Sequence, residues 1–206
     1  MLYSILILFM DTFFRLFLVK DINGIKNMPK NACIIASNHV SYLDPPILGS
    51  VISKNLNKKI HFLAKIELFK SFLSRAAQKV FESIPVDREK KDNLWIKSAK
   101  KYIKNDHIIG IFPEGERSRS GKLQKGKTGV IRLALAANAP IVPVGIIGTY
   151  YLLPMNKRFP KIKRIVKINI GKPIYYGQYY RRKITKSLLR RLTDNLMLEI
   201  GKLTVK

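Results

Sequence analysis

A short apolar run ends in a polar turn, and a pair of prolines follows a few residues later. The run covers residues 32–36, contains one Cys and two Ile, and is typical of a buried strand. It stops at Ser37-Asn38, and Pro45-Pro46 marks a new element, because proline is favoured in the first turn of a helix. The residue before a proline is pushed out of the α region, so Asp44 is well placed to cap that helix. The stretch therefore predicts a strand that feeds a helix through a short bend.

The rest of the chain alternates apolar runs with amphipathic segments. Strands are predicted at residues 61–64, 80–86, 108–112, 141–147 and 162–170, and helices at residues 45–51, 66–79, 93–104, 126–138 and 185–203. This alternation predicts one α/β domain with a mixed, largely parallel sheet flanked by helices, and 206 residues suit one core of ordinary size. Basic residues alternate with Ile and Val in residues 162–170, as in an exposed or edge strand. Residues 21–30 are predicted to be a turn-rich connection.

The first segment, Leu2 to Val19, is rich in Leu, Ile and Phe and predicts a helix. It lacks the basic start and the cleavage site of a signal peptide, and charges in its middle make it a poor membrane-spanning helix. Those charges, Asp11 and Arg15, are four residues apart, so they share a helix face and can pair. An aromatic-rich apolar surface beside a narrow polar stripe suits a helix lying in a membrane interface, with a core helix as the alternative. We expect residues 1–20 to be a membrane-associating helix.

The charge of the chain is strongly positive. It has 39 Lys and Arg against 13 Asp and Glu, a formal charge of +26, which indicates an anionic partner such as lipid headgroups, phosphorylated substrates or nucleic acid. Basic clusters at residues 157–167 and 181–191, with tyrosines at positions 175, 176, 179 and 180, would serve a nucleic-acid-binding protein. No nucleic-acid motif is present, however, and an apolar first helix has no use there. We therefore expect anionic membrane lipid, and no nucleic acid, as the partner. The single Cys33 excludes a disulfide within the chain and fits a reducing cytoplasm.

Polar residues follow three of the predicted strands, where active sites of α/β sheets gather. His39 and Asp44 would face each other across the first bend, so that the carboxylate orients the imidazole and leaves its other nitrogen free as a base. Asn38 either contributes to the same site or finishes the strand in a turn. No cluster of His and Cys indicates a metal site.

The other two strand ends carry arginines. Arg88 follows residues 84–87, and Arg117 follows Glu114-Gly115-Glu116; a guanidinium offers a planar fork that matches phosphate oxygens. Each Arg alone would more often form a surface ion pair with a neighbouring carboxylate. Gly115 permits a positive φ or the close approach of a ligand to the backbone.

Four segments, in order, carry a family resemblance. They read NHVSYLD at residues 38–44, IPVDR at 84–88, FPEGERS at 112–118 and IVPVGI at 141–146, with AKIELF at 64–69 and KGKTG at 125–129 between them. Over about residues 30 to 150 the chain resembles the glycerolipid acyltransferase family, which includes 1-acylglycerol-3-phosphate acyltransferases. The resemblance implies an acyltransferase catalytic domain at residues 21–206. Together with the first helix, this predicts a peripheral, monotopic protein at the cytoplasmic face of the cell membrane.

The resemblance further implies transfer of a fatty acyl group from acyl-coenzyme A or acyl carrier protein to lysophosphatidate, giving phosphatidic acid. Glycerol 3-phosphate or another lysophospholipid is the alternative acceptor, and no metal or cofactor is expected. His39 and Asp44 would be catalytic, while Arg88 and Arg117 would bind the acceptor's phosphate. Glu114, Gly115 and Asn38 complete the expected substrate-binding set.

Two points of the chemistry follow from the residues. A free alcohol is a poor nucleophile at neutral pH, so His39 would remove its proton while Asp44 stabilises the imidazolium. Backbone N–H groups near Gly115 or at the first bend are candidates for stabilising the oxyanion.

Glu116 stands where the family more often has Thr, and its carboxylate is expected to pair with Arg117 and weaken the grip of Arg117 on a phosphate.

Overall fold

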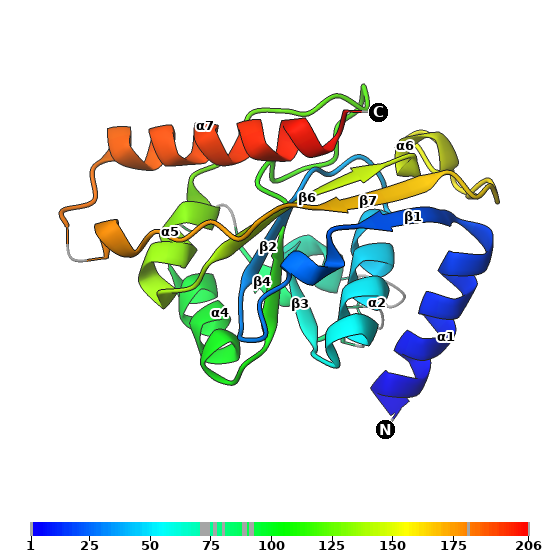
Figure 1. Cartoon of the computed structure of the whole chain (residues 1–206), viewed down its shortest axis with the longest axis horizontal. Helices are drawn as coiled ribbons and strands as arrows, with labels where there is room; N and C mark the ends of the chain where they lie inside the picture. Colours follow the sequence, from blue (N-terminus) through cyan, green and yellow to red (C-terminus); the bar gives the residue numbers. More distant parts are fainter. Residues whose placement is uncertain are drawn as a thin grey trace.

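The computed structural model describes residues 2–70, 75, 78–79, 81–87, 90, 93–180 and 182–205 (Figure 1). The elements run in the order α1 (Leu2–Phe17), β1 (Val19–Asn23), η1 (Ile25–Asn27), β2 (Ile34–Ser37), α2 (Asp44–Leu56), β3 (Ile60–Lys65), η2 (Ile66–Phe69), β4 (Ile84–Val86), α4 (Leu94–Lys104), β5 (Ile108–Ile111), α5 (Gly129–Ala137), β6 (Ile141–Ile147), α6 (Thr149–Leu152), β7 (Val166–Ile170), η3 (Gly177–Tyr179) and α7 (Lys186–Leu203).

One seven-stranded sheet organises the chain, in the order β1-β7-β6-β2-β5-β3-β4. The strands from β6 to β4 are all parallel, while β7 is antiparallel to β6 and parallel to β1. The sheet is therefore mixed and largely parallel, which confirms the fold class predicted from the sequence.

Two sequence predictions about the sheet edge were wrong. The strand expected at residues 162–170 begins only at Val166, and it is not an edge strand, because β1 pairs with it on the side away from β6. The edge strand on this side of the sheet is β1, which runs from the end of the expected first helix into the segment expected to be a turn-rich connection. Only one of its five residues, Val19, is buried, so it lacks the apolar pattern that identifies a strand.

Helices cover both faces of the sheet (Figure 1). On one face, α1 and α2 pack over strand residues that include Ile35, Ile60 and Val142. On the other face, α4, α5 and α7 pack over residues that include Ile34, Ile109 and Ile141. Neighbouring residues of one strand thus belong to opposite cores, and this is why the central strands read as continuous apolar runs.

The first helix turns its acidic residue inward and a group of large apolar residues outward. Asp11 is fully buried and pairs with Arg15 of the same helix at 2.8 Å and with Lys54 of α2 at 3.1 Å. Ile7 and Phe14 are buried as well. Apart from Thr12, the exposed residues described in this helix are large and apolar: Ile5, Leu8, Phe9, Phe13, Leu16 and Phe17. Within the described chain, no helix combines the length and the apolarity needed to cross a membrane.

Candidate active site

The side chains of His39 and Asp44 meet where β2 ends and α2 begins. His39 Nδ1 lies 2.8 Å from Asp44 Oδ2. A carboxylate only accepts hydrogen bonds, so Nδ1 carries the proton and Nε2 keeps the lone pair. This is the tautomer that a general base needs.

Asp44 also holds the bend together. Its Oδ2 accepts the backbone N–H groups of Val40 at 2.7 Å and Ser41 at 2.8 Å, and the whole residue is buried. Asp44 is therefore not the helix cap expected from the sequence: α2 begins at Asp44 itself, Leu43 is the N-cap, and the carboxylate turns back toward the preceding bend. Its Oδ1 is buried and has no hydrogen-bond partner in the part of the chain that the structure describes.

Aromatic rings fix the plane of the imidazole. The His39 ring stacks on Phe112, just after β5, with centroids 4.0 Å apart and planes inclined by 18°. Phe112 stacks in turn on Phe62 of β3, at 5.6 Å. The imidazole is thus held at Nδ1 by Asp44 and on one face by Phe112, and its side chain keeps 16% of its surface exposed.

The side chain of Glu114 links the backbone at His39 to the backbone at Gln124. Its Oε1 accepts the N–H of His39 at 2.7 Å, and its Oε2 accepts the N–H of Gln124 at 2.9 Å. Burial raises the pKa of Glu114 to about 7; the two N–H donors oppose that shift, and the nearby charge of Asp44 adds to it. A carboxylate with both oxygens on the backbone acts here as a brace for the site.

Arg117 lies over an aromatic ring from the first bend. Its guanidinium carbon is 3.3 Å from the centroid of the Tyr42 ring, and its Nη1 is buried without a hydrogen-bond partner among the described residues. The loop that carries it is anchored to the bend, because Ser118 N–H donates to the carbonyl of His39 at 2.8 Å. The ion pair expected between Arg117 and Glu116 is not formed in the described chain, where Glu116 is exposed.

Gly115 has a φ of +81°, the left-handed conformation that its sequence position suggested. Four of the backbone donors in these two segments, near Gly115 and at the first bend, are already in use. The Gly115 N–H donates to the Phe112 carbonyl at 3.0 Å, and those of His39, Val40 and Ser41 donate to the carboxylates of Glu114 and Asp44. An oxyanion would need other donors.

Asn38 joins two strands. Its Nδ2 donates to the carbonyl of Ile146 at 2.9 Å, and its Oδ1 accepts the N–H of the same residue at 2.8 Å. The side chain is buried, and its amide is committed to the backbone of β6. Of the two roles considered from the sequence, these contacts support the one that finishes the strand.

The chain matches the family model described as Acyltransferase over residues 20–147. The chain belongs to the acyltransferase family. It is 30% identical to the 1-acyl-sn-glycerol-3-phosphate acyltransferase of Bacillus subtilis, over 88% of this chain and 86% of that one. It is 28% identical to the probable 1-acyl-sn-glycerol-3-phosphate acyltransferase of Mycoplasma pneumoniae, over 82% of this chain and 68% of that one.

A solved structure has the same fold. The crystal structure of the 1-acyl-sn-glycerophosphate acyltransferase PlsC from Thermotoga maritima aligns with a TM-score of 0.74, over 99% of this chain and 82% of that one, at 23% identity. The family match and the relative from Bacillus subtilis confirm the family predicted from the four sequence blocks.

Three of the four blocks of this acyltransferase are brought together where β2, β5 and β6 end. The first block forms the bend, the third forms the loop that contacts it, and the fourth is β6, in which Val142 and Val144 are fully buried core residues. The second block ends at Arg88, which lies outside the described residues, so its contact with a phosphate stays a prediction.

The sequence reasoning missed the residues that support the site. Tyr42 and Phe112 provide the rings under Arg117 and His39, and Ser41 donates from Oγ to the carbonyl of Leu153 at 2.8 Å. Tyr42 and Phe112 stand inside recognised blocks, and an aromatic residue within a polar turn was the available signal for Tyr42. In the described chain no group of three or more His, Cys, Asp or Glu side chains is arranged to hold a metal ion.

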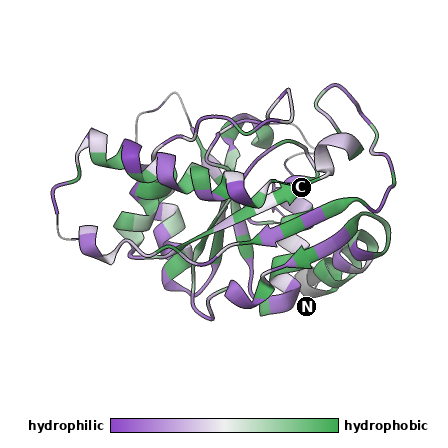
Figure 2. Cartoon of the chain, turned by 45° about the horizontal axis from the view of Figure 1, so that its top comes forward, coloured by the Kyte–Doolittle hydropathy of each residue, from purple (hydrophilic) through white to green (hydrophobic). Residues whose placement is uncertain are grey.

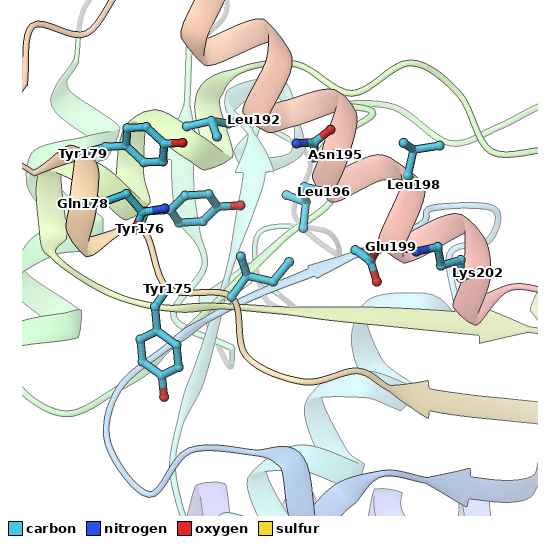
Figure 3. A pocket seen from close by; sticks show the side chains of 11 residues that line it. Tyr175, Tyr176, Gln178, Tyr179, Leu192, Asn195, Leu196, Leu198, Glu199 and Lys202 are labelled. Carbon is cyan, nitrogen blue, oxygen red and sulfur yellow. Dashed lines mark hydrogen bonds and ion pairs between the residues drawn. The ribbon is translucent and has the colours of Figure 1, made fainter.

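A separate groove of about 460 Å³ lies between α7 and residues 174–179 (Figure 3). Ile174 in this groove bridges to Ile141, the first residue of β6, so this part of it lies at the opposite end of β6 from the site. None of the predicted site residues lines it. The tyrosines considered for base stacking are in this region, and Tyr176 is a buried core residue.

Proposed function

We propose that this acyltransferase moves a fatty acyl group from a thioester to the free hydroxyl of 1-acylglycerol-3-phosphate, giving phosphatidic acid. The observation that carries the proposal is the contact between His39 Nδ1 and the buried carboxylate of Asp44. The names of the two bacterial relatives support the choice of acceptor. The acyl donor is a co-substrate, either acyl-coenzyme A or acyl carrier protein. A thioester is already activated, so the reaction calls for no metal or cofactor.

His39 acts as the general base. The acceptor hydroxyl attacks the thioester carbonyl carbon while Nε2 of His39 takes its proton, and a carbon–oxygen bond forms as the carbonyl π bond opens. The buried negative charge of Asp44 stabilises the imidazolium that results. When the tetrahedral intermediate collapses, the carbon–sulfur bond breaks and the leaving thiolate takes the proton from His39. General-base help of this kind contributes roughly 10²- to 10⁴-fold in rate.

Arg117 binds the phosphate of the acceptor. Its guanidinium is held flat on Tyr42 and has a buried, unpartnered Nη1 within the described chain, so an anion can take up a donor that is otherwise unsatisfied. Its loop is hydrogen-bonded to His39 through Ser118, so the phosphate would be fixed beside the base. Arg88 is proposed as the second phosphate ligand from its place in the second block.

Acyl transfer by the detergent-purified chain tests this proposal. Oleoyl-coenzyme A and oleoyl acyl carrier protein are each offered with lysophosphatidate, glycerol 3-phosphate or 1-acylglycerol, which lacks the phosphate. Phosphatidic acid should form from lysophosphatidate, and the product of 1-acylglycerol should form much more slowly. His39→Ala should abolish both reactions. Equal rates with and without the phosphate would contradict the role of Arg117. Activity that is unchanged in His39→Ala would contradict the mechanism.

The same enzyme is proposed to sit on an anionic membrane surface, at the cytoplasmic face of the cell membrane. Phe9 and Leu16 of α1 are 70% and 62% exposed, while the acidic residue of the helix, Asp11, pairs with Lys54 of α2. An outward apolar face of this kind favours burial in the interfacial region of a bilayer. The double variant Phe9→Ser/Leu16→Ser should bind anionic vesicles more weakly than the wild type and keep its activity in detergent.

A further inference from the structure

The connection between α6 and β7, residues 154–164, exposes apolar and basic side chains together. Its sequence, PMNKRFPKIKR, has five basic residues and no acidic one. Phe159 is 84% exposed and Ile162 is 68% exposed, so both point away from the core. Lys157, Arg158, Lys161 and Lys163 are exposed beside them. We call this segment the basic loop.

Both ends of the basic loop are fixed to the domain. The N–H of Lys161 donates to the carbonyl of Leu152, just before the loop, at 2.8 Å, so the chain doubles back toward α6. At its end, Arg164 Nε donates to the carbonyl of Val19 at 2.9 Å. The apolar tips are therefore presented from a supported turn.

The basic loop lies beside the C-terminal end of α1. The N–H of Val166 donates to the carbonyl of Leu18 at 2.9 Å, and Ile165 packs against the core that contains Phe14 and Leu18. Figures 1 and 2 both place the loop and α1 at the same end of the molecule. The exposed apolar residues at the end of that helix, Leu16 and Phe17, thus adjoin the loop.

The loop is also connected to the active site. Ser41, two residues after His39, donates from Oγ to the carbonyl of Leu153, the residue that precedes the loop. A surface that holds the loop and α1 would therefore lie close to the bend that carries the catalytic base. A lipid acceptor whose acyl chain stays in such a surface could therefore reach His39 without leaving the surface.

We propose that the basic loop is a second membrane-binding element, which inserts Phe159 and Ile162 into an anionic bilayer beside α1. Apolar tips flanked by cations match a lipid surface, where the rings enter the interface and the cations meet the headgroups. Each Lys or Arg near an anionic surface strengthens binding about fivefold. This inference rests on the membrane attachment proposed for α1.

Fluorescence of a single tryptophan in the full chain tests the insertion. The chain has one Trp, Trp95 of α4, so Trp95→Phe provides a background for Phe159→Trp and, as a matched control, for Leu198→Trp on the exposed face of α7. Vesicles of equal parts phosphatidylcholine and phosphatidylglycerol should shift the emission of the Phe159→Trp protein to the blue, and brominated lipids should quench it. The Leu198→Trp protein should show neither effect.

Binding to the same vesicles gives a second measurement. The variant Phe159→Ser/Ile162→Ser should bind at least roughly tenfold more weakly than the wild type, because two apolar side chains no longer leave water. The control Leu198→Ser/Tyr175→Ser removes two exposed apolar residues from the groove beside α7 and should bind like the wild type.

The outcomes separate this inference from the attachment proposed for α1. Wild-type binding by the Phe159→Ser/Ile162→Ser variant, with no shift of the Phe159→Trp emission, would overturn the loop proposal; if Phe9→Ser/Leu16→Ser still weakened binding, the attachment through α1 would stand. Absence of wild-type binding to anionic vesicles would overturn both. An emission shift caused by single-stranded RNA but not by vesicles would overturn the loop proposal in favour of nucleic acid.

Discussion

His39 and Asp44 are joined by a 2.8 Å contact between Nδ1 and Oδ2, across a bend of only four intervening residues. The same oxygen accepts the N–H groups of Val40 and Ser41, so one buried atom orients the base and shapes the bend. A change at Asp44 therefore affects both the backbone and the imidazole, and substitutions must be chosen to separate the two.

Asp44→Asn separates them. The amide oxygen can keep accepting from the bend while the amide nitrogen takes the place of Oδ1, which has no partner in the described chain. The negative charge that stabilises the imidazolium is lost, so we expect kcat to fall roughly 10²- to 10⁴-fold with a near-native circular dichroism spectrum. Asp44→Ala also removes the acceptor from the bend and should lower the thermal midpoint as well. A kcat of Asp44→Asn within a few-fold of the wild type would rule out this role.

Arg117→Ala should act on one substrate only. Loss of charge-assisted hydrogen bonds to the acceptor's phosphate is worth roughly 1.5–3 kcal/mol, so KM for lysophosphatidate should rise about 10- to 100-fold. KM for the acyl donor should not change. The matched control is Arg132→Ala on α5, whose guanidinium bonds to Asn93 at 2.7 Å and which should leave both KM values as they are.

The ring under Arg117 gives a companion prediction. Tyr42→Phe keeps a ring face for the guanidinium and should leave KM for lysophosphatidate nearly unchanged. Tyr42→Ala removes a cation–π contact worth about 0.5–2 kcal/mol and should raise that KM roughly 2- to 30-fold. If Tyr42→Phe and Tyr42→Ala had the same KM, the contact would not position Arg117.

Asn38→Ala should lower stability and leave substrate binding alone. It deprives the Ile146 N–H and carbonyl of their side-chain partner, at a cost of roughly 1–3 kcal/mol for each group left unsatisfied. Denaturant unfolding measures this loss, and Asn23→Ala, which breaks an exposed bond to Asn169, should cost far less. A raised KM at unchanged stability would instead support the substrate-binding role predicted from the sequence.

The central strands could be predicted from the sequence because burial on both faces leaves continuous apolar runs. The strands β2, β5 and β6 are of this kind. The short elements carried no such signal: β1 buries a single residue, and α6 has four residues, too few for a helical period. The position of β7 between β1 and β6 depends on pairing between distant segments, which no local pattern records.

The contact between His39 and Asp44 could be predicted because proline and the end of an apolar run fix where the chain turns. The roles of Asn38 and Glu114 could not, because an amide or a carboxylate beside a site can face either the ligand or the backbone. Their partners, Ile146 and Gln124, are supplied by the tertiary fold. The stacking of His39 on Phe112 likewise joins two strand ends that are distant in sequence.

Glu114 should make the stability of the folded chain depend on pH. Its pKa is about 7 in the folded state against an ordinary value of 4.5, so between these values the folded chain keeps a proton that the unfolded chain has lost. The contribution of Glu114 to the free energy of unfolding is therefore complete below about pH 4.5 and falls as pH rises toward 7, by of the order of 3 kcal/mol.

Glu114→Gln removes this titration, so its free energy of unfolding, measured in denaturant at fixed pH, should lack that fall. The variant also loses the acceptor for the Gln124 N–H, which lowers its stability by an amount that does not vary with pH. The free energy of unfolding of the wild type minus that of the variant should therefore shrink or change sign between pH 4.5 and 7. Glu116→Gln changes an exposed carboxylate of the same loop and is the matched control. A flat difference for Glu114→Gln would mean that its pKa is not raised, and that the two N–H donors offset the effect of burial.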